Sequence, residues 1–207
     1  VGGLSITGNS VPMRVVSSGS TGYIQLGASG TSQYPQLAIT GDALTLRTAY
    51  TDRMTIDNTG CITTPSQPAF FAYNTSTRSN VTGNEVLYTV LFDTEVFDQN
   101  ADFASNTFTA PVSGRYFLQG QVSTDAQTTT NTDGILALIT SNNTFSTYYN
   151  PGNMEGTNAT GQVSISFSGI FDMDASDTAY VTIKIYQGSQ TINVMATNTY
   201  FTGALIA

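Results

Sequence analysis

The stretch Asn106–Asp125, NTFTAPVSGRYFLQGQVSTD, decides how the rest of the chain is interpreted. It begins with a short apolar strand, Thr107–Thr109, and turns at Ala110-Pro111-Val112-Ser113-Gly114, where proline and glycine fix the backbone. Period-2 alternation follows the turn and indicates a half-buried strand. The residues expected to face a core are Tyr116, Leu118, Gly120 and Val122. The stretch therefore predicts a β-hairpin.

The other face of this strand carries Phe117 together with Gln119 and Gln121. A large aromatic side chain among polar neighbours needs a cover, which is either another sheet or another subunit. We therefore expect a β-domain that does not stand alone.

The composition favours an all-β fold. Of 207 residues, 40% are hydrophobic and only 10% are charged, so the surface must consist largely of Thr, Ser, Asn, Gln and Gly. The 19 glycines and the 11 tyrosines and 11 phenylalanines suit turns and strands. No segment of helix length shows a convincing 3.6-residue period.

The charge distribution excludes two classes of partner. The net charge is −8, and the six basic residues are scattered: Arg14, Arg47, Arg53, Arg78, Arg115 and Lys184. A nucleic-acid-binding surface needs a basic stripe, so we expect no nucleic-acid partner. The chain also lacks an apolar span of membrane length, so we expect no membrane insertion.

Residues 1–64 differ from the rest because they contain short apolar pieces that recur at irregular spacing. These pieces are Leu4–Gly8, Tyr23–Gly27, Leu37–Gly41, Ala43–Leu46 and Met54–Gly60. Each piece buries too little to fold alone, whereas three copies wrapped about one axis would give every strand partners from other chains. Tyr50–Gly60 resembles segments of bacteriophage tail-fibre shafts. We therefore predict a β-rich, intertwined trimeric shaft; the alternative is an ordinary small β-domain.

Residues 65–68 form a short proline-containing linker, and residues 69–207 form a second domain of many strands. The expected strands are Ala69–Tyr73, Glu85–Phe92, Thr107–Thr109, Gly114–Thr124, Gly134–Thr140, Phe145–Tyr149, Gln162–Phe171, Thr178–Gln187 and Asn198–Ile206. This number of antiparallel strands suggests a two-sheet jelly roll. Tyr180 and Tyr186, on one face of their strand, suit either a subunit interface or an ordinary surface.

Five short motifs in this domain resemble the globular head of complement C1q. They are Pro68-Ala69-Phe70, Val90–Asp93, the pattern Phe108-x-x-Pro111-x-x-Gly114-x-Tyr116, Ser176–Val181 and Tyr200–Ile206. Leu118 departs from the pattern, because the family has Phe there. The resemblance covers about Pro68 to Ala207 and implies a C1q-like (TNF-like) jelly roll that assembles as a trimer.

Few residues offer catalytic or metal chemistry. The chain has no histidine, which removes Ser-His-Asp and Cys-His catalysis. Asp93 and Glu95 lie on one face of a strand as a carboxylate pair would, but such acids more often cap turns, and we expect no enzyme. Asp172, Asp174 and Asp177 are a weak candidate for calcium, because the set lacks the other ligands of a calcium loop.

Cys61 is the only cysteine, so no intrachain disulfide can form. A free cysteine of this kind either is buried or cross-links chains, and we expect it to be buried.

The function is expected in loops. Alternating strand direction places Thr124–Asp133, Asn150–Thr160 and Gln187–Asn193 at one end of the head, and the first two are longer than ordinary hairpin loops. The residues expected to contact a receptor are Asp125, Gln127, Asn131, Asp133, Tyr148, Tyr149, Asn153, Glu155, Asn158, Gln187 and Gln190. Their amides, acids and rings suit sugar hydroxyl groups.

These features together lead to one hypothesis and two alternatives. The chain is expected to be the homotrimeric receptor-binding tip of a bacteriophage tail fibre, extracellular on the virion, attached to the rest of the fibre. Its partner would be a host cell-surface receptor, either a glycan or a protein. The alternatives are a secreted C1q-domain lectin or adhesin of a cell, and a glycan-degrading tail protein.

Overall fold

The computed structural model describes residues 19–25, 32–33, 35–155, 160–196 and 198–207. The chain divides into two compact units, Val1–Ser66 and Gln67–Ala207. The predicted strand at Leu4–Gly8 lies outside the described residues.

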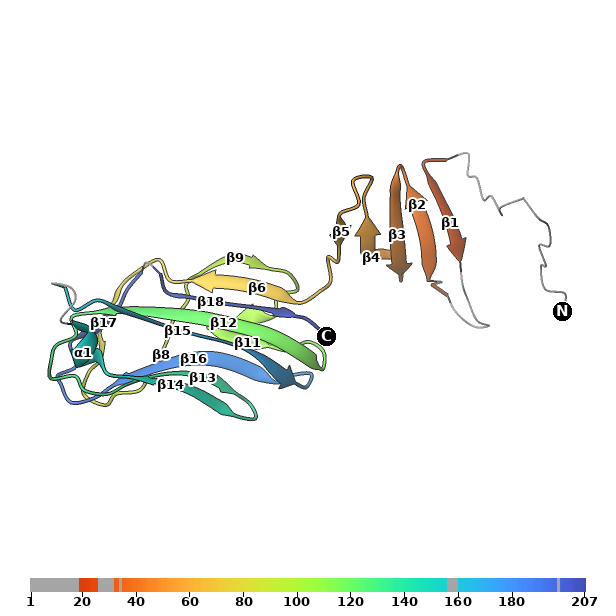
Figure 1. Ribbon diagram of the computed structural model, residues 1–207. Coiled ribbons are helices and arrows are strands. Elements are labelled where there is room, and N and C mark those ends of the chain that lie inside the picture. Colours follow the sequence, from red (N-terminus) through yellow and green to blue (C-terminus); the bar gives the residue numbers. More distant parts are fainter. Residues whose placement is uncertain (1–18, 26–31, 34, 156–159, 197) are drawn as a thin grey trace. The chain divides into compact units, whose positions relative to one another are not determined.

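The first unit is a single antiparallel sheet whose strands follow one another in chain order (Figure 1). Its strands are β1 (Thr21–Gln25), β2 (Gln36–Thr40), β3 (Ala43–Thr48), β4 (Thr51–Ile56) and β5 (Ile62–Thr63). Each described strand therefore pairs with its neighbours in the same chain. Tight turns such as Gly41 at φ +58° keep consecutive described strands together, and the expected pairing with strands of other chains stays a prediction.

Cys61 is exposed, contrary to our prediction of a buried thiol. It lies in the tight turn between β4 and β5, where the Asp57 carboxylate accepts hydrogen bonds from the backbone N–H groups of Thr59 (2.8 Å) and Cys61 (2.9 Å). A turn closed by its own aspartate leaves no core for the thiol to enter.

The second unit, the head, is all-β apart from one short helix among its described residues. Its first strands are β6 (Ala69–Tyr73), β7 (Arg78–Thr82), β8 (Tyr88–Thr89), β9 (Thr94–Asp98), β10 (Phe103–Ala104), β11 (Thr107–Thr109) and β12 (Gly114–Asp125). The remaining elements are β13 (Gly134–Thr140), β14 (Thr144–Tyr149), α1 (Pro151–Glu155), β15 (Val163–Met173), β16 (Thr178–Ile185), β17 (Ile192–Val194) and β18 (Tyr200–Leu205).

The long strands form two packed sheets with jelly-roll connectivity (Figure 1). One sheet contains the run β6-β18-β12-β15, and the other contains the run β11-β16-β13-β14. The chain thus crosses from one sheet to the other several times, as two Greek keys require. The predicted all-β jelly-roll sandwich is confirmed.

An aromatic cluster joins the two sheets. Phe70, on β6 of the first sheet, stacks on Phe103 and Phe108 of the second sheet with ring centroids 4.9 Å apart in both cases. Phe201 meets the edge of Phe70 at 5.0 Å. All four side chains are at most 4% exposed, so the head has its own core.

The stretch Asn106–Asp125 does not form the predicted hairpin. β11 pairs with β10 and β16, whereas β12 pairs with β15, β17 and β18, so the turn between them crosses from one sheet to the other. The Tyr116 hydroxyl donates to the Val112 carbonyl at 2.7 Å and fixes this crossing. The predicted inward faces of Tyr116, Leu118 and Val122 are confirmed, because each is at most 1% exposed.

One predicted strand is largely absent. Of Glu85–Phe92, only Tyr88–Thr89 pairs as β8, because the preceding residues form a loop in which Glu85 has φ +73°. The short strands β7, β9, β10 and β17 were not predicted from the sequence, since segments of two to five residues carry too little alternation to detect.

Candidate functional site

The predicted loops come together at one end of the head, which is the end that carries α1 in Figure 1. The Gly152 N–H donates to the Asn131 carbonyl at 2.7 Å, and the Asn131 side-chain amide donates to the Tyr186 carbonyl at 3.3 Å. The Ala126 N–H donates to the Thr160 carbonyl at 3.2 Å. The prediction that these loops share one end is therefore confirmed.

Asn131 holds this end together. Its side chain is 2% exposed, and its Oδ1 accepts a hydrogen bond from the Thr128 N–H at 2.9 Å. A Cβ atom at Gly188 would lie 2.4 Å from the Asn131 Nδ2, and one at Gly152 would lie 3.1 Å from the Asn131 carbonyl oxygen. Two glycines thus let neighbouring loops approach Asn131 closely.

Gln127 and Tyr149 form a second buried contact beneath the loops. Gln127 is 3% exposed, and its amide donates to the Thr124 hydroxyl. Burial raises the pKa of the Tyr149 hydroxyl, an effect that the neighbouring Gln127 amide partly offsets. The Tyr149 ring lies over Gly134, where an added Cβ would lie 2.4 Å from the ring.

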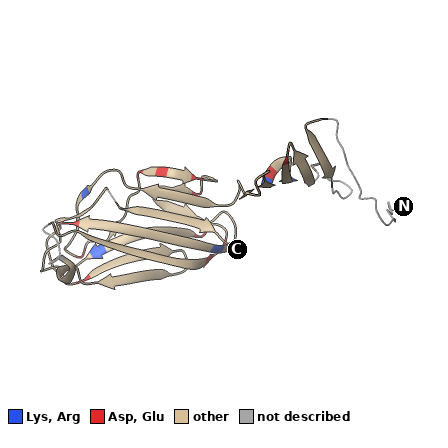
Figure 2. Cartoon of the chain, turned by 45° about the horizontal axis from the view of Figure 1, so that its top comes forward, with Lys and Arg blue, Asp and Glu red and all other residues tan. Residues whose placement is uncertain are grey.

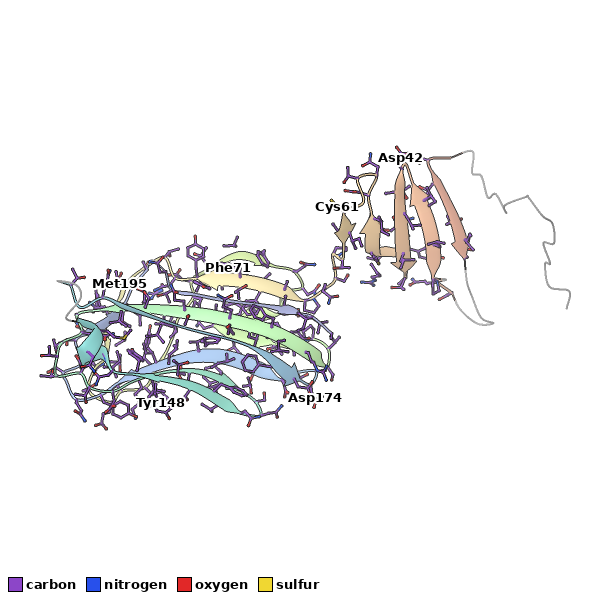
Figure 3. The ribbon with its side chains drawn as sticks, in the orientation of Figure 1. Asp42, Cys61, Phe71, Tyr148, Asp174 and Met195 are labelled. Carbon is purple, nitrogen blue, oxygen red and sulfur yellow. The ribbon has the colours of Figure 1, made fainter. Side chains whose placement is uncertain are left out.

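The predicted receptor residues therefore separate into two groups. Gln127, Asn131 and Tyr149 point their polar groups inward and support the loops, so they are not available to a ligand on the surface. The exposed group consists of Asp133, Tyr148, Asn153, Gln187 and Gln190. Tyr148 is 74% exposed on β14 (Figure 3).

The short helix α1 was not predicted from the sequence, and it begins with a side-chain cap. Asn150 precedes Pro151, and its Oδ1 accepts a hydrogen bond from the Asn153 N–H at 3.1 Å. Asn153 is exposed on this turn, and Glu155 is its last residue. Asn158 lies outside the described residues.

Two predicted residues lie at the side of this end. Asp125 is half-buried and accepts a hydrogen bond from the Asn193 amide at 2.6 Å. Gln190 donates to the Asn80 carbonyl at 3.0 Å. Asp125 thus links β12 to β17, and Gln190 links the loop between β16 and β17 to β7.

A fourth loop, residues 83–87, joins this end and was missed by sequence reasoning. The Gly188 N–H donates to the Gly83 carbonyl at 2.8 Å, and the Glu85 N–H donates to the Ile185 carbonyl at 3.0 Å. Leu87 is 60% exposed. The Gly83-Asn84 dipeptide is the turn signal that could have identified this loop.

The chemistry of this end is that of hydroxyl groups, amides and tyrosine rings. Thr132 donates to the Gln187 Oε1 at 2.5 Å, and the Lys184 ammonium lies 4.5 Å from the centre of the Tyr186 ring. Figure 2 shows lysine, arginine and acidic residues only at scattered positions over the head. Such a surface can donate and accept many hydrogen bonds but offers little net charge for an ionic ligand.

The carboxylate pair that the sequence suggested serves the structure. The Asp93 carboxylate accepts hydrogen bonds from the Thr75 N–H (2.8 Å) and hydroxyl (2.7 Å), and it pairs with Arg78 at 2.8 Å. Burial opposes ionisation of Asp93, but the bonds from Thr75 and the charge of Arg78 outweigh it and lower the pKa. A general acid needs a raised pKa, so Asp93 does not suit that role.

The weak calcium candidate does not form a ligand set. Asp174 accepts from the Ser113 hydroxyl (3.2 Å), Asp177 accepts from the Asn142 amide (2.7 Å), and Asp172 lies opposite Arg115 in the β12–β15 ladder. No group of three potential ligands from His, Cys, Asp and Glu gathers anywhere in the described ranges. The three aspartates instead close a turn and pair across strands.

The outer face of the β6-β18-β12-β15 sheet is unusually aromatic. Phe71 stacks on Tyr200 at 5.5 Å and contacts Phe97 at 6.4 Å. Phe71, Tyr200 and Val96 line an open groove of about 640 Å³. Farther along this face, Phe117 is 38% exposed, and Ile170, opposite it in the ladder, is 61% exposed. The head itself leaves Phe117 partly uncovered, so the expected cover by a subunit stays a prediction.

The chain matches no protein-family model and no curated protein. Solved structures similar to it include the globular domain of zebrafish complement 1qA protein, at 21% identity and TM-score 0.45, with 68% of this chain and 98% of that chain covered. Murine APRIL at pH 8.0 is 12% identical at TM-score 0.46, with 68% and 100% covered. These are C1q-type and TNF-type jelly-roll domains.

Within the described part of the chain, no helix has the length and apolar character needed to cross a membrane.

Proposed function

We propose that this chain is the receptor-binding tip of a bacteriophage tail fibre, with the shared loop end of the head as the recognition surface for host cell-surface glycans. The observation that carries the proposal is the division of polar residues at this end. Asn131 and Gln127 are buried and hold the loops, whereas Tyr148, Asn153 and Gln187 are exposed on the resulting rigid surface. Preorganised loops lose little entropy on binding.

The exposed groups favour a sugar over an ionic ligand. Tyr148 offers an accessible ring for stacking, and Asn153 and Gln187 offer amides that both donate and accept hydrogen bonds. Sugars present an apolar ring face and several hydroxyl groups, which match these two features.

The same proposal includes a homotrimer, with the aromatic outer face of the head as a subunit contact. Ile170 and Phe97 are 61% and 47% exposed there, and a protein surface seldom leaves such a continuous apolar patch in water. Three copies would present three weak sites together, so avidity would supply what single sites lack.

A glycan array and a host-adsorption assay with the full chain test the recognition surface. Tyr148→Ala should reduce glycan binding at least tenfold, because it removes the most exposed ring of the loop end. Tyr50→Ala, at a 56% exposed tyrosine of the first unit, is the matched control and should leave binding unchanged. Equal binding by Tyr148→Ala and the unaltered chain would discard this surface.

A separate measurement distinguishes the binder from an enzyme. Polysaccharide from a host that adsorbs the protein should keep its chain length after prolonged incubation. Release of shortened glycan would support the glycan-degrading alternative instead.

A further inference from the structure

Two rows of apolar side chains cross one face of the β1–β5 sheet. The strand register places them opposite one another in successive strands. The first row is Ile24, Leu37, Leu46 and Met54, and the second row is Ile39, Leu44, Ile56 and Ile62. We call these eight residues the apolar face; none of them is charged.

The apolar face has no cover among the described residues of the first unit. Ile39 is 48% exposed, Leu46 is 46% exposed and Ile62 is 59% exposed, although all are large aliphatic residues on strands. The described part of this unit forms one layer only, and a stable domain needs at least two layers around a core.

The opposite face of the same sheet carries small and polar side chains. Ala38 and Thr45, which pair with each other there, are buried, at 0% and 2% exposed. Arg47 forms an ion pair with Asp52 and donates to the Thr40 hydroxyl at 3.4 Å. The sheet therefore has one face of small and polar side chains and one open apolar face, as period-2 alternation along its strands produces.

We infer that the apolar face is the surface on which copies of this chain pack against one another, and that the strands lie across the axis of the assembly. The inference rests on the proposed homotrimer and goes beyond it by naming the contacting face. The copies meet through side chains, while every strand keeps its hydrogen-bonding partners in its own chain.

Two reasons indicate that the molecule that covers the apolar face is another copy of this chain. A one-layer sheet with an open apolar face is marginally stable in water, and a second copy of this chain supplies an apolar surface of the same chemistry wherever the chain is present. The area also agrees, since eight half-exposed aliphatic side chains offer roughly 600 Å², close to the ~800 Å² that each partner of a stable interface contributes.

The rows also define the direction of the assembly. Neighbouring strands lie about 4.8 Å apart, so a row that crosses four strands is roughly 14 Å long. Rows from several copies can pack side by side only along their common length. The axis of the assembly therefore runs along the rows and across the strands.

Thiol accessibility in the full chain tests this inference. Ile39→Cys and Thr40→Cys are made separately in a Cys61→Ser background, so that each protein has one thiol on the same strand but on opposite faces. In a lone chain both positions are exposed, whereas copies packed through the apolar face cover only residue 39. We expect maleimide to modify Ile39→Cys at least tenfold more slowly than Thr40→Cys.

Molar mass by light scattering, measured on the same samples, separates the possible failures. Equal modification rates in a protein of three-chain mass would overturn the apolar face as the contact but keep the trimer. A mass of one chain, 21.9 kDa, would overturn both.

A charge variant pair checks the result independently. Ile39→Asp should lower the mass of the assembly or the melting temperature of the first unit, while Thr40→Asp should behave as the unaltered chain. Equal behaviour of the two aspartate variants would overturn the inference.

Discussion

The two units of this chain differ in whether the apolar side of their sheets is covered by residues of the same unit. The head folds two sheets onto each other and buries Phe70, Phe108 and Phe201 between them, so its core is complete within one chain. The first unit has strands of similar length and alternation, but its sheet has only one layer and leaves Ile39 and Leu46 half-exposed. Alternation of apolar and polar residues predicts strands in both units. Whether another sheet of the same chain covers their apolar side depends on how the strands are connected.

The core of the head provides the first test of this difference in cover between the two units. Phe70→Ala should destabilise the head by about 4 kcal/mol, because it removes a fully buried ring in contact with three others. The loss should be the same at all protein concentrations, as measured by denaturant unfolding of the head. Leu44→Ala in the first unit is the regional control, and its effect should grow on dilution. A concentration-dependent loss for Phe70→Ala would contradict a self-contained head.

A pair of glycines compares backbone constraints in the two units. Gly83 and Gly41 both have positive φ, at +123° and +58°. A Cβ at Gly83 would lie 2.1 Å from the Ser189 carbonyl oxygen, whereas nothing lies within 4 Å of one at Gly41. Gly83→Ala should therefore cost about 3 kcal/mol and Gly41→Ala about 1 kcal/mol. Equal shifts in melting temperature would show that the loop at Gly83 can move away.

Asn131 links stability to recognition at the loop end. Asn131→Ala leaves the Thr128 N–H and the Tyr186 carbonyl without their side-chain partner, which should cost about 2 kcal/mol. Glycan binding should fall with it, although Asn131 itself is 2% exposed. Asn142→Ala, in an exposed loop outside this end, is the control. It should lower stability and glycan binding less than Asn131→Ala does. Full binding by a destabilised Asn131→Ala protein would contradict the supporting role.

The smallest expected effect depends on pH. The pKa of Asp93 is lowered in the folded head, so its carboxylate stabilises the fold at neutral pH, and this contribution is lost as the pH falls through the folded-state pKa. Asp93→Asn should cost about 1 kcal/mol at pH 7, in keeping with an exposed pair, and progressively less below about pH 4. Asp42→Asn, in the β2–β3 turn of the first unit, is the control. An unchanged deficit at pH 3 would contradict the ion pair with Arg78.

Much of the head could be predicted from local pattern. Tyr116, Leu118 and Val122 face the core as their alternation indicates. The pairing partner of β11 could not be predicted, because the turn after it leads either back to the same sheet or across to the other. That choice depends on contacts distant in sequence, such as the Ala110 N–H with the Asp177 carbonyl at 2.8 Å.

The candidate site was predicted at the level of loops but not of side chains. Asn131 and Asn153 are chemically identical and both lie in polar loops, yet one is buried and the other is exposed. Their roles depend on how the loops pack on one another in the fold. The residue type alone does not predict this packing. The loop at residues 83–87 was mistaken for a strand because Val86, Leu87 and Val90 are apolar.

Hydrogen exchange of the full chain across a dilution series tests the central claim most directly. Amides of β2, β3 and β4 should be protected at concentrations where the mass is that of three chains and should lose protection on dilution, while amides of β12 and β18 stay protected throughout. Protection of β2–β4 that persists in a protein of one-chain mass would contradict the account, because the single-layer sheet would then be stable by itself.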